Sequence, residues 1–161
     1  MRVPLRETLE NRIEGEAAMD KKRQVLIVTN AITGDEITEI KKAFDDQYSH
    51  QMNIKLSLVH IIPRLPTCYF NIPAMGVLME KYYQEARDLL TYVGKHLEIP
   101  MKDQWLISGK ARSEVLRLAN KLGSSFILAG AEQIKELQHS LFFKHIHQYE
   151  NIRNINQLKQ L

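Results

Sequence analysis

Short apolar runs alternate with amphipathic segments along most of the chain, and these runs are typical of strands buried on both faces of a sheet. The four runs are Val25–Val28, Ile54–Ile62, Trp105–Gly109 and Phe126–Ala129. The last run stops at Gly130, which permits a tight backbone turn before the next helical pattern. We therefore predict four parallel strands, with the run at Phe126 in a central position and the shorter third run at an edge.

Apolar residues recur every three or four positions in the segments that follow the strands, which predicts helices. The first helix follows Thr33, and Thr33 with Glu36 has the spacing of a capping box. A long helix begins near Met75 and ends before Pro100, and a third ends at Gly123. We expect the apolar stripe of the long helix to pack in the core. This stripe consists of Leu78, Met79, Tyr82, Ala86, Leu89, Val93 and Leu97.

Strands that alternate with helices over a whole domain imply right-handed crossovers and a parallel sheet with helices on both faces. We therefore predict a three-layer α/β domain of flavodoxin-like or Rossmann-like type over residues 21–161. In such open sheets, ligands bind at the carboxyl ends of the strands, where the strand order reverses. The turn at Gly130 is thus the first place to expect a ligand. The segment Pro63–Pro73 holds three prolines and predicts a loop.

The N-terminal segment departs from this scheme. Residues 1–20 carry charges of both signs and few apolar groups, which is typical of a disordered tail or an upstream extension. Leu5, Leu9 and Ile13 have helical spacing, so a helix induced by a partner is the alternative. Met19 is an alternative start to Met1.

The C-terminal segment 151–161 is also atypical. Ile152, Ile155 and Leu158 recur every third residue among polar neighbours, which favours a helical or frayed end over a buried fifth strand. Before it, a last helix is expected after the fourth strand. Its apolar residues are Leu137, Leu141, Phe142, Ile146 and Tyr149.

Composition narrows the classes of function. The net charge of +3 is small and the basic residues are scattered among acidic ones, which does not indicate a nucleic-acid partner. No apolar run approaches the roughly 18 residues of a membrane helix, so no membrane partner is expected. Cys68 is the single cysteine, which excludes an intrachain disulfide and fits a cytoplasmic protein.

Several segments between Arg23 and Tyr149 resemble the universal stress protein family in their order and spacing. They are Val25–Val28, Leu56–His60 as the second strand, Ser108–Lys110 before the third helix and Phe126–Gly130 as the fourth strand. The resemblance implies the adenine nucleotide alpha hydrolase-like version of the fold and a role in the stress response. It also implies a homodimer.

The ATP-binding branch of that family carries the motif Gly-x2-Gly-x9-Gly-Ser/Thr after the fourth strand. Gly130 fills the first position, but the next positions hold Gln133, Phe143 and Lys144. Glycines let backbone N–H groups close around phosphates, whereas a phenylalanine side chain would fill that space. The family's acidic ribose ligand corresponds here to Asn30. The chain therefore resembles the universal stress protein A type, which lacks the motif.

The resemblance also implies where a nucleotide would bind if the site still worked. The residues are Thr29, Asn30, Ile61, Gly109, Gly130 and Ala131. We expect no cofactor, with ATP or AMP as the alternative. In the family the dimer commonly forms through the last strand, which this sequence lacks or has made polar. Another candidate surface is the last helix, with Phe142, Phe143, Ile146 and Tyr149.

The histidines do not predict a metal site. His145 and His147 are two residues apart and point in different directions on a helix, and neither pairs with His139 at a spacing of four. We expect His60, at the end of the second strand, to be a hydrogen-bonded structural residue. We therefore predict no metal.

Two further features have ordinary explanations. Lys110 and Arg112 beside Gly109 could attract an anion at a helix start, but solvated surface charges are the favoured interpretation. Cys68 has only Arg64 nearby in sequence to lower its pKa, so we expect an inert thiol.

Three functions compete. The leading hypothesis is a non-enzymatic stress-response protein that acts through protein contacts and has a degenerate nucleotide site. The alternative is a regulatory module that binds ATP or AMP. A small hydrolase or transferase is the third, but the chain has no Gly-x-Ser-x-Gly elbow, Walker loop or Gly-x-Gly-x-x-Gly turn. We therefore predict that the protein is not an enzyme.

Overall fold

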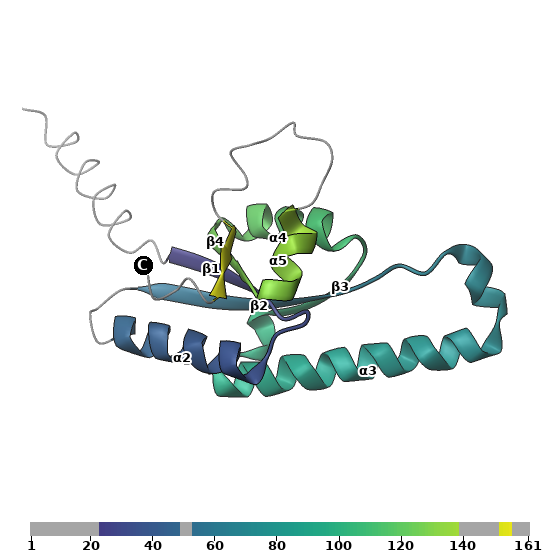
Figure 1. Cartoon of the computed structure of the whole chain (residues 1–161), viewed down its shortest axis with the longest axis horizontal. Coiled ribbons are helices and arrows are strands. Elements are labelled where there is room, and N and C mark those ends of the chain that lie inside the picture. Colours follow the sequence, from purple (N-terminus) through teal and green to yellow (C-terminus); the bar gives the residue numbers. More distant parts are fainter. Residues whose placement is uncertain (1–22, 49–52, 139–151, 156–161) are drawn as a thin grey trace, which may run out of the picture.

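The structure, a computed structural model, describes residues 23–48, 53–138 and 152–155 (Figure 1). Five parallel strands form one sheet in the order β3-β2-β1-β4-β5. They are β1 Arg23–Val28, β2 Ile54–Ile62, β3 Gln104–Ser108, β4 Ser124–Ala129 and β5 Ile152–Asn154. β3 lies at an edge as predicted, whereas β1 takes the middle place and β4 lies between β1 and β5.

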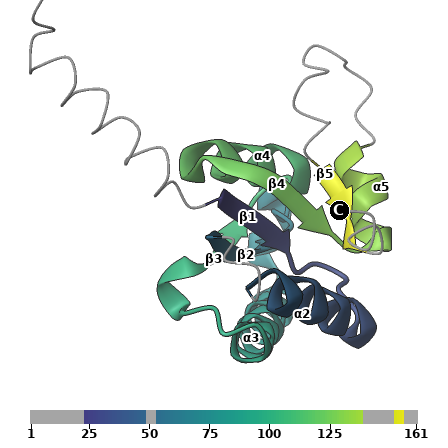
Figure 2. The same ribbon diagram turned by 90° about the vertical axis from the view of Figure 1, so that its left-hand side faces the viewer.

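The helices cover both faces of this sheet (Figure 2). They are α2 Gly34–Tyr48, α3 Pro73–His96, α4 Ala111–Leu122 and α5 Ala131–Gln138, with short 3₁₀ helices η1 Thr67–Asn71 and η2 Met101–Asp103. α2 and α3 pack on one face, and α4 and α5 pack on the other. The predicted three-layer α/β fold is thus confirmed.

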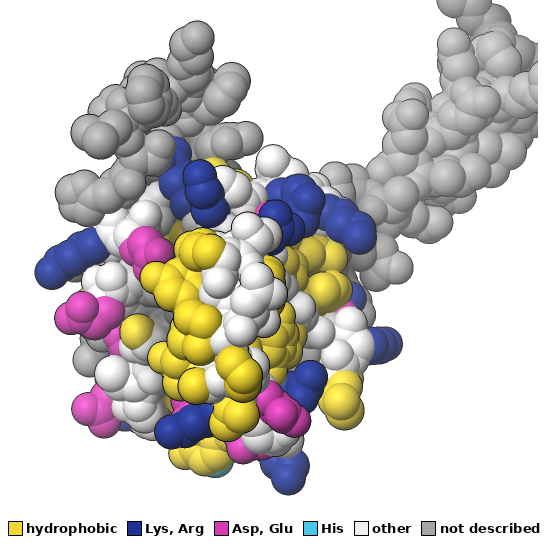
Figure 3. Space-filling model, turned by 90° about the vertical axis from the view of Figure 1, so that its right-hand side faces the viewer, with side chains coloured by type: hydrophobic (Ala, Val, Ile, Leu, Met, Phe, Trp, Pro, Cys, Tyr) yellow, Lys and Arg dark blue, Asp and Glu magenta, His cyan; other side chains and the backbone are white. Residues whose placement is uncertain are grey.

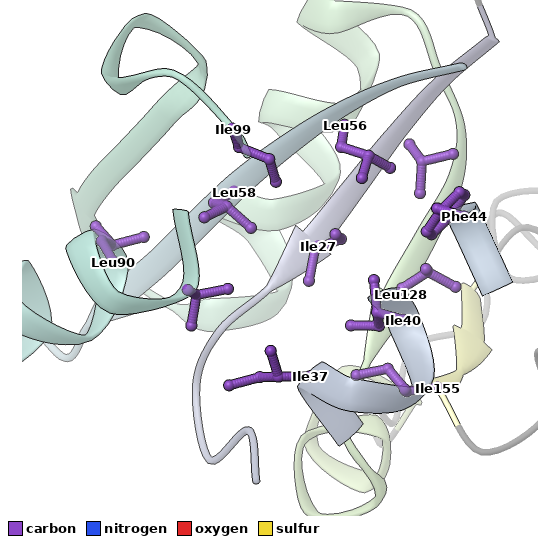
Figure 4. Close-up of a cluster of buried hydrophobic side chains, with 12 residues drawn as sticks. Ile27, Ile37, Ile40, Phe44, Leu56, Leu58, Leu90, Ile99, Leu128 and Ile155 are labelled. Carbon is purple, nitrogen blue, oxygen red and sulfur yellow. The ribbon is translucent and has the colours of Figure 1, made fainter. Parts of the chain in front are cut away.

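The alternation of side chains along β1 builds two core layers. Val25 and Ile27 point to the α2/α3 side, and Leu26 and Val28 point to the α4/α5 side. Figure 4 shows the first layer, in which Ile27 meets side chains from β2, β4, α2 and α3. Because both layers are apolar, β1 has no solvated face, which explains its unbroken apolar run.

The C-terminal segment corrects one prediction. β5 pairs with β4 in parallel, with Ile127 opposite Ile152 and Ala129 opposite Asn154. Ile155 follows directly, is 1% exposed and belongs to the α2/α3 core layer. The helical or frayed end predicted here is therefore wrong for Ile152 to Ile155. A three-residue strand is too short to show alternation, so only its pairing with β4 reveals it.

The long helix corrects a second prediction. In its second half, Ala86 and Val93 are buried as expected, whereas Leu90, outside the predicted stripe, is buried in place of the half-buried Leu89. In its first half, however, Leu78 and Tyr82 remain 36% and 47% exposed. The helix is longer than the sheet beneath it, so its first turns extend beyond the other elements (Figure 1). Helical periodicity identifies an apolar face but cannot say how much of it finds a partner.

Several predictions fall on other parts of the chain. The N-terminal segment 1–20 and the greater part of the last helix, including Phe142 and Phe143, lie outside the described residues. The predicted end of the third helix is confirmed. Gly123 ends α4, in the left-handed conformation with φ of 65°. No helix in the described ranges is long and apolar enough to cross a membrane.

The buried position of Ile155 yields a stability prediction. Ile155→Ala should lower the free energy of unfolding by about 2–5 kcal/mol, because it leaves a cavity in the core beside β5. Urea unfolding measures the change. Met101→Ala is the control, since Met101 is 84% exposed and its truncation should change stability by about 0.5 kcal/mol or less. Equal effects of the two changes would show that Ile155 does not pack in the core.

Candidate functional site

The carboxyl ends of β1 and β4 meet where the strand order reverses, the usual ligand position in an open α/β sheet. Two loops leave the sheet there in opposite directions, one from β1 to α2 and one from β4 to α5. Of the six residues assigned to a nucleotide, Thr29 and Asn30 follow β1, Gly130 and Ala131 follow β4, and Ile61 lies on β2. Gly109 follows β3, further from the reversal.

Asn30 is bonded to the main chain of the next strand. Its side-chain Nδ2 donates to the Ile61 carbonyl at 2.7 Å, and its Oδ1 accepts from the Ile61 N–H at 2.8 Å. The amide therefore extends the ladder between β1 and β2 by one residue. This structural pair of hydrogen bonds uses both ends of the Asn30 amide.

Thr29 is fully buried and links β1 to His60. Its hydroxyl donates to the Val59 carbonyl at 3.2 Å, and Oγ1 lies 2.9 Å from His60 Nδ1. Since the hydroxyl has one proton, the imidazole N–H is the donor in the second bond. Burial lowers the pKa of His60 below its ordinary value of 6.5. His60 is therefore held as a neutral, hydrogen-bonded side chain.

Glu36 lies at the point where the strand order reverses. Its carboxylate is buried and accepts the Thr33 N–H at 2.9 Å and the Ala131 N–H at 3.1 Å. Thr33 Oγ1 in turn accepts the Glu36 N–H at 3.3 Å, which confirms the predicted capping box. Ala131 is the first residue of α5, so the chain's own carboxylate occupies the helix N-terminus at which a phosphate would bind.

Both glycines near the site are covered by glutamates. A Cβ at Gly130 would lie 2.7 Å from Glu36 Oε2, and a Cβ at Gly109 would lie 2.6 Å from Glu114 Cγ. The glycines thus admit a close approach, but the approaching group is a carboxylate of the same chain. Glu114 also pairs with Arg117 on α4. The Glu36 carboxylate beside Gly130 would repel an incoming phosphate, whereas Arg117 balances the charge of Glu114.

The described residues offer few other candidate binding or catalytic groups. They contain no group of three or more His, Cys, Asp or Glu side chains placed to hold a metal ion, and His139, His145 and His147 lie outside them. The described residues also form two hollows away from the point where the strand order reverses. One, of about 330 Å³, is lined by Phe44 of α2 and His96 of α3, and the other lies against β3 and α4. Cys68 is exposed on η1.

The role of Glu36 at this site could not be read from the sequence. The capping-box spacing placed its carboxylate beside Thr33, three residues away. Its second partner, Ala131, is 95 residues away in sequence, and no local pattern links them. Only the order of the strands brings the N-terminus of α5 close to the N-terminus of α2, from opposite faces of the sheet.

Comparisons with known proteins bear on the family. No protein-family model matches the chain. Universal stress protein A homolog 1 of Coxiella burnetii is 33% identical over 81 residues. The match covers 48% of this chain and 56% of that relative, so it spans about half of each. The resemblance to the universal stress protein family is thus confirmed by sequence.

Two solved structures are also similar. A member of the universal stress protein family from Burkholderia pseudomallei is 14% identical with a TM-score of 0.48, and the alignment covers 70% of this chain and 84% of that one. A candidate universal stress protein from Pseudomonas aeruginosa UCBPP-PA14 is 11% identical with a TM-score of 0.49, covering 87% of this chain and 51% of that one. Both likenesses are too distant to carry an argument.

The bridge made by Glu36 predicts a loss of stability when it is weakened. An amide has one acceptor oxygen, so Glu36→Gln should leave one of the two N–H groups without its partner. We expect the free energy of unfolding to fall by about 1–3 kcal/mol in urea titrations. Glu80→Gln, on an exposed turn of α3, is the control and should change it by about 0.5 kcal/mol or less. An unchanged Glu36→Gln protein would contradict the bridge.

His60 predicts a pH dependence. Because the folded-state pKa lies below the unfolded value of 6.5, the unfolded chain binds more protons, so stability falls as the pH drops below about 6.5. The His60→Gln variant should show a smaller loss of unfolding free energy between about pH 7.5 and pH 5.5 than the wild type. A His60→Gln slope equal to that of the wild type would exclude His60 as the group responsible.

Proposed function

This chain is related to the universal stress protein family, and on that premise we propose that it is a non-enzymatic stress-response protein that acts through protein contacts. Its nucleotide site is degenerate. The observation that carries the proposal is the Glu36 carboxylate bound to the Ala131 N–H, where a nucleotide phosphate would need that donor. An internal carboxylate competes for this donor at no entropic cost of association, whereas a free nucleotide must bear that cost.

Three further contacts support the same function. The side-chain amide of Asn30, which stands in place of an acidic ribose ligand, is bonded at both ends to Ile61. Gly109 is covered by Glu114. A nucleotide would therefore have to displace two carboxylates and break a pair of hydrogen bonds. The Thr29 hydroxyl lies 2.9 Å from His60 Nδ1, the arrangement of a nucleophile and a base, but Thr29 is fully buried, so a substrate could not reach it there.

The remaining expectations follow from this function. The protein needs no ATP or AMP as a cofactor. It acts in the cytoplasm, and its partners are other proteins. The six residues Thr29, Asn30, Ile61, Gly109, Gly130 and Ala131 are then the remnant of a nucleotide site, kept because their hydrogen bonds hold the strand ends together. A regulatory module that binds ATP or AMP is the alternative that the next experiment separates.

Calorimetric titration tests the degenerate site. MgATP, ADP, AMP and cyclic nucleotides should give no binding to the full chain tighter than about 1 mM, a free energy of about −4 kcal/mol. Glu36→Ala frees the Ala131 N–H and should raise the affinity for AMP at least about tenfold, because it removes both the competing acceptor and a negative charge. Glu80→Ala, which removes an equal charge from exposed α3, is the control and should leave AMP binding unchanged.

The outcomes separate the two functions. Micromolar binding of ATP or AMP to the wild type, lost in an Asn30→Ala variant, would establish the regulatory module and refute this proposal. Mass spectrometry of the native protein gives a second readout, since a co-purified nucleotide would have the same meaning.

A further inference from the structure

The connection between β2 and α3 forms an arm that extends beyond the sheet (Figure 1). It contains η1 and the first half of α3, which contact each other. Six large apolar side chains are exposed on it, and we call them the apolar arm. They are Tyr69, Phe70, Ile72, Val77, Leu78 and Tyr82. Figure 3 views this end of the molecule, where hydrophobic side chains gather and charged ones lie mainly around them.

The exposure of these side chains is large. Phe70 is 70% exposed and Val77 is 72% exposed. A fully buried aromatic side chain covers about 150–250 Å² and an aliphatic one covers less, so the six exposed fractions amount to on the order of 500 Å² of apolar surface. The largest apolar patch on a typical monomeric protein covers about 300–600 Å². A patch of this size lies within that range, and such patches are often functional.

Most of the arm is also free of charge, and only Glu80 and Lys81 lie beside Tyr82 at its end. The fifteen residues from Leu65 to Met79 contain no Lys, Arg, Asp, Glu or His, and charge resumes only at Arg64 and Glu80. Aromatic and methionine residues without charges are the composition found at the centre of protein interfaces. A neutral surface attracts neither the phosphates of nucleic acids nor anionic lipids. Its occupant should therefore be apolar and uncharged.

Part of the exposed surface continues the buried face of the same helix: Tyr82 lies four residues before Ala86, whereas Val77 lies on the opposite side of α3. Met75 and Met79 lie in line with Ala86, Leu90 and Val93 at helical spacing, and the latter three pack against the sheet. The half of α3 that extends beyond the sheet thus presents a core-type face that another helix of the same kind could cover. The half-buried methionines can adapt their shape to such a partner.

We propose that the apolar arm binds the apolar arm of a second copy of this chain in a two-fold symmetric dimer. The area supports this occupant, because on the order of 500 Å² from each copy gives about 1,000 Å² in total, about the least that a specific interface buries. A two-fold axis places the same patch on both sides of the interface, so an uncharged surface meets an uncharged one. This interface differs from pairing of the last strands, and it does not depend on the nucleotide site.

Light scattering and sedimentation equilibrium of the full chain test the dimer. The wild type should reach twice the chain mass of 18.7 kDa as its concentration rises. The double variant Phe70→Glu/Leu78→Glu places charges in the centre of the arm and should raise the dissociation constant about thirty-fold or more, the effect of losing an interface hot spot. Circular dichroism verifies that this variant folds.

A matched variant controls for added charge. Tyr92→Glu/Met101→Glu introduces the same two charges at exposed apolar residues away from the arm, at 51% and 84% exposure. Its dissociation constant should stay within about threefold of the wild type. A wild type that remains at 18.7 kDa, whatever else the arm then binds, or a dimer weakened equally by both variants, would overturn the proposal.

The single cysteine gives a second readout. A nitroxide label on Cys68, exposed on η1 beside Tyr69, reports one distance between the two copies. In a dimer of arms the two labels should be close enough to broaden each other's electron paramagnetic resonance spectrum, and dilution with unlabelled chain should remove the broadening. A dimer whose labelled spectrum shows no broadening would place the interface elsewhere, for example on β5, and would refute the arm as its site.

Discussion

Polar groups at the carboxyl ends of buried parallel strands must find partners, and this constraint shapes the molecule. Most of β1 has no solvated face, so where the strand ends, water cannot freely satisfy the main chain and the side chains that follow. In this protein the chain supplies the partners itself. Asn30 bonds to Ile61, Thr29 to Val59 and His60, and Glu36 joins the loops that begin α2 and α5.

The same contacts that stabilise the fold also limit what it can bind. In an open α/β sheet the N-terminus of the helix after an inner strand is a ready anion site. Here Glu36 takes that place, and Glu114 covers the glycine after β3. A site filled by side chains of its own protein favours structure over ligand binding. The proposed loss of nucleotide function therefore has a direct physical cause in the placement of two glutamates.

The opposite situation holds on the arm. α3 has 24 residues, more than the sheet can cover, and its first turns carry apolar side chains with no partner in the described chain. The nucleotide region is thus filled from within, whereas the β2–α3 connection leaves core-type surface open. A protein that works through contacts needs the second kind of surface more than the first, so the two features support one view of the molecule.

Local patterns in the sequence were sufficient for four of the five strands, the helices and the layered α/β fold. Burial on two faces produces the unbroken run of Val25–Val28, and a helix end needs a residue such as Gly123. The capping box of Thr33 and Glu36 was equally predictable from the sequence, because both residues lie within one helical turn. The tertiary structure alone decided three matters. Ile152–Asn154 became a strand because β4 offered a free edge. Glu36 reached Ala131 because the strand order brings the N-terminal ends of α2 and α5 together. The first half of α3 stayed exposed because the sheet ends beneath it. Each depends on distances between segments far apart in the chain, which periodicity and residue type do not encode.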